Sequence, residues 1–305
     1  MDVPRFPPAK AKLVLPPPGE AETGDGDTMR LSVPFRLVSV DTPEKRNFAG
    51  PPERSQKLLD AALLVLEGLE RDGKVPRGFA AYFTPRVHDG GAKRHDAAAE
   101  RATRALRSIR SQRLGRSGGK LRDLAVILAG EAVDSNGRML AYVAPFLEKA
   151  ERDRLGPEAK ERRTFNLDLV AEGFAASFPV WPSFPSRRED FTGFLDAAED
   201  AHRRALGSWG NGGAGTLLTG YEFRALVRIG RLAAEVKAGK RTARPSDYLA
   251  VFERHCVDRT GAECGRFGFV DVPHGARIWA WTKAAVPALA AWLAGAPVPA
   301  GAALP

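Results

Sequence analysis

The chain is short of cysteine and has no long hydrophobic run, and both shortages restrict what it can be. Two cysteines among 305 residues cannot build a disulfide framework, and a chain of this length does not need one. The uncharged stretch of residues 284–299 has only 16 residues and contains three prolines. A bilayer span needs about 20 apolar residues, so we expect a docked helix here and no membrane segment.

The N-terminus also lacks the apolar core of a secretory signal peptide. Its first eight residues, Met-Asp-Val-Pro-Arg-Phe-Pro-Pro, contain two charges and three prolines. We therefore expect a cytoplasmic protein, or a secreted one if this sequence is a mature form. The net charge of +9 favours polyanionic partners such as nucleic acids, but it does not indicate a fold.

Three carboxylates and an arginine lie close together in the N-terminal part of the chain. Residues 25–44 read Asp-Gly-Asp-Thr-Met-Arg-Leu-Ser-Val-Pro-Phe-Arg-Leu-Val-Ser-Val-Asp-Thr-Pro-Glu. Hard divalent cations prefer carboxylate oxygens, which Asp27, Asp41 and Glu44 offer. The planar guanidinium of Arg36 matches phosphate oxygens. A cation and an arginine directed at one phosphorus atom are typical of phosphodiester cleavage.

This stretch resembles the signature of the staphylococcal nuclease (thermonuclease) family, which runs Asp-Gly-Asp-Thr, an apolar strand with Phe/Val-Arg-Leu, and Asp-Thr-Pro-Glu. Three further segments follow in the order of that family. Residues 134–143 resemble the hairpin with its second arginine, residues 166–175 the short helix that ends in Gly-Leu/Phe-Ala, and residues 194–209 the last helix. The resemblance covers roughly residues 12–209.

The resemblance implies an α+β fold in which residues 12–209 form a five-stranded OB-fold β-barrel with packed helices. Residues 1–11 would be a tail. Residues 71–121 lie where the family passes directly into its next strand, so we interpret them as an inserted basic segment. Residues 210–216 would be a glycine-rich linker, and residues 217–305, which the resemblance does not cover, a mostly helical C-terminal region.

The resemblance also implies a cation site and a site for the scissile phosphate. Asp27, Asp41 and the backbone carbonyl of Thr42 would bind Ca²⁺ or another hard divalent cation. Glu44 would activate or position the attacking water.

Arg36 and Arg138 would bind the phosphate and stabilise the charge of the trigonal-bipyramidal transition state. The protein would then be a thermonuclease-like endonuclease, a metal-dependent hydrolase of DNA or RNA. The alternative is a non-catalytic OB-fold module that binds nucleic acid. Relatives of that kind have lost site residues, whereas this chain keeps them.

Two features bear on the geometry of this site. Arg36 and Asp41 are five residues apart, so an unbroken strand would place them on opposite faces. Either a bulge intervenes or Asp41 lies beyond the end of the strand, and the Thr-Pro that follows favours the second. The aromatic nucleotide-contacting segment of the family aligns imperfectly with residues 177–182, where Trp181 is the candidate contact. Asn136 replaces a tyrosine that the family often has before Gly-Arg.

The inserted segment is strongly basic. Ten Lys and Arg residues lie between Lys93 and Arg122, and arginine recurs at every third position from residue 101 to residue 116. Each step of three advances 300° around an α-helix, so the arginines wind around it and three neighbours share a face. A solvated helix and a nucleic-acid contact both fit this pattern. In the second case we expect phosphate contacts that do not read sequence. The candidate residues are Arg104, Arg107 and Arg110.

The remaining segments predict ordinary elements. We expect strands at residues 13–15, 124–128 and 138–143, a hairpin of residues 29–32 with 35–40, and helices from residue 52 and at residues 190–206, 246–255 and 278–294. Thr219 and Glu222 have the spacing of a capping box.

A zinc site made by two cysteines and two histidines has little support. The four residues are His255, Cys256, Cys264 and His274. They contain no CxxC pair, and a local disulfide or ordinary thiols are alternatives.

Overall fold

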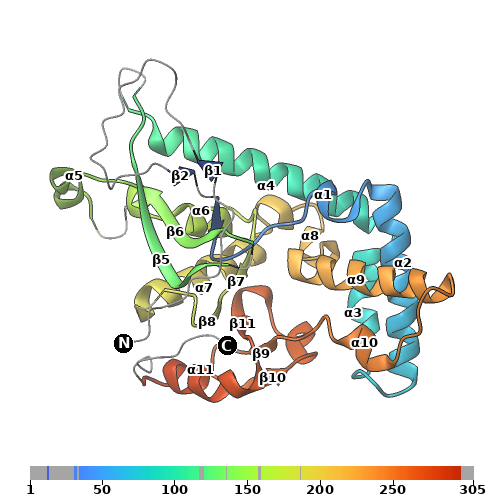
Figure 1. The fold of residues 1–305 in the computed structure, drawn as a ribbon. Helices are drawn as coiled ribbons and strands as arrows, with labels where there is room; N and C mark the ends of the chain where they lie inside the picture. The colour runs from blue at the N-terminus through green and yellow to red at the C-terminus, as the bar shows by residue number, and fades with distance from the viewer. Residues whose placement is uncertain are drawn as a thin grey trace.

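The computed structural model describes residues 12–13, 31–32, 34–116, 120–134, 136–156, 159–185 and 187–296. Asp27 lies outside these ranges, as do Val14 and Leu15 of the expected first strand. The described residues form an α+β fold, as expected, with helices around several small sheets (Figure 1). None of the helices in these ranges is long and apolar enough to cross a membrane.

The helices hold many more of the described residues than the strands do. They are α1 (Arg46–Ala49), α2 (Pro52–Arg71), α3 (Phe79–Val87), α4 (Gly91–Leu114), α5 (Lys149–Arg154), α6 (Phe165–Ala171), α7 (Arg188–Arg203), α8 (Gly213–Thr216), α9 (Gly220–Lys237), α10 (Pro245–Leu249) and α11 (Val286–Leu293). The prediction of a helix from residue 52 is confirmed, because Pro52 stands in the first turn and Leu59, Leu63 and Leu66 bury one face. The inserted segment is helical, with α3 and α4 as its elements.

The strands are short, apart from one hairpin. They are β1 (Lys12–Leu13), β2 (Leu31–Ser32), β3 (Phe35–Leu37), β4 (Ser39–Asp41), β5 (Leu124–Val133), β6 (Met139–Pro145), β7 (Ala176–Phe178), β8 (Val180–Trp181), β9 (His255–Val257), β10 (Glu263–Gly265) and β11 (Ile278–Ala280). The predicted pairing of β5 with β6 is confirmed, and the turn between them places Gly137 at φ 74°.

Four separate sheets result, and within the described residues none of them closes into a barrel. Their strand orders are β1-β2, β3-β6-β5, β4-β7 and β10-β9-β11-β8. The five-stranded OB barrel is therefore not confirmed. The expected hairpin of residues 29–32 with 35–40 does not form among these residues either, because β2 pairs with β1 and β3 runs parallel to β6.

A break between β3 and β4 sets the directions of Arg36 and Asp41. Ser39 has φ 59°, a left-handed value that bends the strand after Val38. The buried amide of Asn166 on α6 holds this bend, since its Nδ2 donates to the carbonyls of Val38 (2.9 Å) and Ala141 (3.1 Å). Asp41 remains inside β4. The strand that carries Arg36 ends at Leu37, so Asp41 lies beyond its end, as the second alternative had it, but in a strand of its own that pairs with β7.

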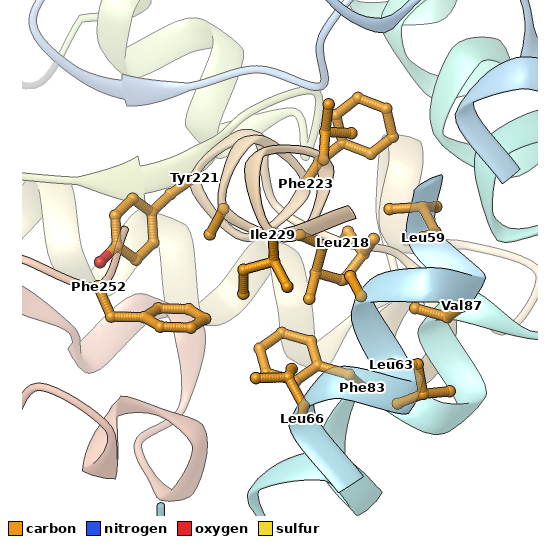
Figure 2. Close-up of a cluster of buried hydrophobic side chains, with 14 of the residues drawn as sticks. Leu59, Leu63, Leu66, Phe83, Val87, Leu218, Tyr221, Phe223, Ile229 and Phe252 are labelled. Atoms are coloured by element: carbon orange, nitrogen blue, oxygen red, sulfur yellow. The ribbon is translucent and has the colours of Figure 1, made fainter. Parts of the chain in front are cut away.

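Helix α9 lies in the middle of the largest core. Its predicted capping box is confirmed, since Thr219 accepts from the Glu222 N–H and Glu222 accepts from the Thr219 N–H. Figure 2 shows Ile229 of α9 and Leu218 facing Phe83 of α3 and Leu66 of α2. Gly230 is pressed so closely against α2 that a Cβ would lie 2.0 Å from the Leu58 carbonyl oxygen.

The C-terminal residues share a sheet with the earlier part of the chain, because β11 runs parallel to β8. Residues 210–216, expected as a linker, contain α8 and pack beside the buried Trp209. The helices expected at 246–255 and 278–294 shrink to α10 and α11. Of their other residues, His255 lies in β9 and residues 278–280 form β11. Ile278 is buried in this sheet, so tertiary packing overrides the helical pattern there.

Candidate functional site

Five charged side chains gather where β4 ends. Arg36 comes from β3, Asp41 from β4 and Glu44 from the following loop. Arg138 lies just before β6, and Arg224 lies on α9. Arg224 binds Asp41 and Glu44 directly, and Arg138 precedes the residue that pairs with Phe35. The charges of all four shift the pKa of the Arg36 guanidinium. The structure therefore brings together four of the predicted site residues, and it adds an arginine from the C-terminal region. It cannot place Asp27, which lies outside the described residues.

Asp41 is buried, and both of its oxygens have partners. Nη2 of Arg224 lies 3.0 Å from Oδ1, and the backbone N–H of Tyr221 donates to Oδ2 at 2.5 Å. The carboxylate thus caps the N-terminus of α9, where unpaired N–H groups favour a negative charge. Gly220 covers the neighbouring Thr42, since a Cβ on Gly220 would lie 2.4 Å from the Thr42 carbonyl oxygen.

Glu44 is held at its side chain and at its backbone. Its Oε1 accepts from Nη1 of Arg224 at 2.5 Å, and its N–H donates to Nε2 of His95 at 2.7 Å. His95 is buried and stacks on Phe223 with ring centroids 3.8 Å apart. Burial lowers the pKa of His95 to about 3, so the ring stays neutral and can accept this hydrogen bond.

The three arginines of the site differ in how their charge is balanced. Arg224 is bound by Asp41 and Glu44, which raise its pKa against the effect of burial. Arg138 is paired with Asp134 of its own hairpin (Nη2–Oδ2 2.6 Å). Arg36 has no hydrogen bond or ion pair with a described side chain.

The environment of Arg36 disfavours its positive charge, although the guanidinium stays protonated. Burial lowers its pKa, and the positive charges of Arg224 and Arg138 act in the same direction. Asp41 and Glu44 oppose them. No ion pair with a described side chain offsets the effects of burial and of the neighbouring arginines on Arg36.

The described residues do not fit a calcium ion in this arrangement. Asp41 offers no free oxygen, Gly220 covers the carbonyl of Thr42, and Arg224 lies between the two carboxylates. Within the described ranges no group of three or more His, Cys, Asp or Glu residues could hold a metal ion. Calcium binding therefore stays a prediction from the resemblance.

Trp181 is not available to a nucleotide, which corrects the sequence interpretation. It is 3% exposed and packs against Phe184 and Trp292 of the core beside α11. Its indole ring thus serves the packing between β8 and the C-terminal helix. The sequence could not show this, because α11 approaches β8 only through the tertiary fold.

Arg104, Arg107 and Arg110 of α4 face solvent, as predicted, whereas only 10% of the Arg113 side chain is exposed. Each step of three residues falls 60° short of a full turn of the helix. Arg113 therefore comes round to the face of α4 that packs against the rest of the protein. There it pairs with Asp168 and donates to the carbonyls of Glu161 and Arg163. The predicted helical face exists, and its binding of nucleic acid stays a prediction.

The cysteines and histidines do not form a zinc site in the described structure. Cys256 and Cys264 are free thiols on neighbouring strands. His255 pairs with Glu263 at 3.2 Å, whereas His274 is buried in a stacked contact with Trp209. Of the three alternatives, a zinc site, a local disulfide and ordinary thiols, the structure shows ordinary thiols.

Sequence reasoning missed Arg224 and Gly220. The capping box correctly placed the N-terminus of α9, but nothing in its local pattern shows that this end docks on Asp41. The two segments are about 180 residues apart in sequence. Only the packing of α9 on α2 brings them together.

Comparison with models of known protein families finds no match, and comparison with curated proteins finds no relative. The nuclease resemblance therefore depends on the motifs of this chain alone.

Proposed function

We propose that this protein binds and hydrolyses phosphodiesters of DNA or RNA at the site around Arg36. The observation that carries the proposal is the gathering of Arg36, Arg138 and Arg224 with Glu44 from three distant segments of the chain. Three guanidinium groups in a partly buried position favour a phosphate, because charge-assisted hydrogen bonds strengthen where water is scarce. The sequence motifs add the residue types that phosphodiester hydrolysis needs.

The residues of the site divide the work of hydrolysis among them. Arg36 binds the phosphate, and Arg138 adds positive charge as the attacking water joins the phosphorus. Glu44 accepts the proton of that water, the bond between phosphorus and the leaving oxygen breaks, and the leaving oxygen takes a proton from solvent water. Oε2 of Glu44 has no hydrogen bond to a described residue, and a quarter of its side chain is exposed.

The fold that we propose for this function is the barrel that the resemblance implies. In the described sheet β3-β6-β5, the strand β5 lies at the edge, and several of its large apolar side chains are exposed. Exposed edges of this kind are normally covered or paired. A further strand beside β5 would extend this sheet towards closure.

Replacing Arg36 with glutamine should lower the turnover of an oligonucleotide by about 10²–10³, the scale for losing one preorganised donor. The reason is that the glutamine amide cannot balance the charge of the transition state. Turnover is measured at saturating substrate, with Arg152→Gln on α5 as the control, because Arg152 is exposed and has no ion pair with a described residue. Parent-like cleavage by Arg36→Gln would refute its role.

The exposed face of α4 should govern affinity and leave the chemistry unchanged. Replacing Arg104, Arg107 and Arg110 together with glutamine should flatten the salt dependence of binding to duplex DNA. The slope changes by about 0.9 per phosphate that is no longer neutralised. Affinities measured over a series of salt concentrations give the slope, and turnover at saturating substrate should stay near that of the parent.

The control for this experiment is a variant that removes three positive charges from another part of the surface. Lys237, Lys240 and Arg241 lie at the far end of α9 and are exposed. Their triple glutamine variant should keep the parental slope. Equal slopes in both triple variants would show that α4 is only a solvated surface.

One observation favours the second candidate function, a module that binds nucleic acid without cleaving it. Arg224 already holds both carboxylates that catalysis would use. Binding and cleavage are therefore measured on the same labelled oligonucleotide, over a series of divalent cations. Binding without product in every condition would select the module, and product formation would select the nuclease.

A further inference from the structure

The guanidinium of Arg224 lies between the two carboxylates that the nuclease motif provides. Nη1 is 2.5 Å from Oε1 of Glu44, and Nη2 is 3.0 Å from Oδ1 of Asp41. Only 19% of the Arg224 side chain is exposed. Two of its five N–H groups are used by these carboxylates, so the others can face a ligand.

The helix that carries Arg224 is fixed in the fold. Gly230 touches α2 so closely that no side chain fits there, and Gly220 lies against Thr42. The buried Glu222 of the first turn is bound by Arg277 and Tyr82. Moving α9 away from Asp41 would break all of these contacts, so Arg224 is a permanent part of the site and not a latch.

We infer that Arg224 takes the place of a divalent cation between Asp41 and Glu44, so that this site binds a phosphodiester without a metal ion. The inference rests on the proposed binding of a phosphodiester at Arg36. A cation could enter only by displacing Arg224, which would leave a nearly buried guanidinium without its partners. Arg224 instead orients Glu44 and supplies a fixed positive charge beside Arg36. Arg224 thus positions Glu44 and also offers its remaining N–H groups to the phosphodiester.

The test measures binding and not turnover. A fluorescein-labelled single-stranded oligonucleotide is titrated with the protein in excess EDTA and in millimolar Ca²⁺, and fluorescence anisotropy gives the Kd. We expect the same Kd in both buffers. Arg224→Gln should raise the Kd by about 10- to 100-fold in both, the scale of hydrogen bonds to charged groups.

A matched variant and a direct cation titration complete the experiment. Arg228 lies one turn further along α9 and is exposed, so Arg228→Gln should bind like the parent. If Arg224→Gln does not fold, Arg224→Lys replaces it, because lysine keeps the charge but cannot bridge both carboxylates with a planar fork. Calorimetric titration of the parent with Ca²⁺ and with Mn²⁺, without nucleic acid, should give no binding heat.

The failures of the two proposals are distinguishable. Binding heat with either cation, or an oligonucleotide Kd that falls when Ca²⁺ is added, would overturn the role of Arg224 and leave the proposed function standing. If Arg224→Gln and Arg224→Lys both bind the oligonucleotide with the Kd of the parent, the role of Arg224 is also overturned and the proposed function still stands. If the oligonucleotide does not bind in either buffer, the proposed function fails, and the inference fails with it.

Discussion

Replacing Asp41 with alanine is expected to lower the free energy of unfolding by about 3–5 kcal/mol, the cost of breaking a buried ion pair from one side. The carboxylate is fully buried and holds both Arg224 and the Tyr221 N–H. Its loss leaves a guanidinium without a partner and the first turn of α9 without its cap. Chemical denaturation followed by circular dichroism measures the change.

The control for this prediction is an aspartate with similar partners at the surface. Asp200 on α7 pairs with Arg203 and Arg204, and 38% of its side chain is exposed. Exposed pairs contribute little, so Asp200→Ala should cause a much smaller loss than Asp41→Ala. If Asp41→Ala is as stable as the parent, the carboxylate does not hold α9 and is kept for the site alone.

The sequence pattern within a segment predicted those helices and strands that are stabilised by residues near them in the chain. The apolar face of α2, the strand of residues 124–128 and the capping box at Thr219 each repeat a local rule, and each is confirmed. The α+β class is confirmed for the same reason. The elements that depend on distant partners were missed, such as the strand that contains His255 and pairs with β11.

The sequence predicted most of the residues that form the candidate site, but it did not predict the contacts that these residues make. The motif named Arg36, Asp41, Glu44 and Arg138, and the fold brings them together. It could not show that Asp41 would bind a helix from the C-terminal region, because no periodicity in residues 217–305 encodes that contact. The burial of Trp181 was unpredictable for the same reason.

The second large effect is expected at the buried triad of Tyr82, Glu222 and Arg277. The Tyr82 hydroxyl donates to Oε1 of Glu222 at 2.6 Å, and Nη1 of Arg277 donates to the same oxygen at 2.9 Å. Burial raises the pKa of Tyr82, so its hydroxyl remains a donor. The triad joins α3, α9 and the residue before β11, and it fixes the first turn of the helix that carries Arg224.

Glu222→Ala and Arg277→Ala should each lower the free energy of unfolding by about 3–5 kcal/mol, because each leaves the other charge buried without its partner. The double variant removes both charges, so its loss should fall short of the sum of the single losses by about 0.5–3 kcal/mol. Urea denaturation of the four proteins gives this coupling. The same cycle on Arg259 and Glu199, a pair with partly exposed side chains, should give a coupling near zero. If the two single losses in the free energy of unfolding add up to the loss of the double variant, Glu222 and Arg277 do not act as a unit. The triad would then not fix α9 against Asp41 in the way described.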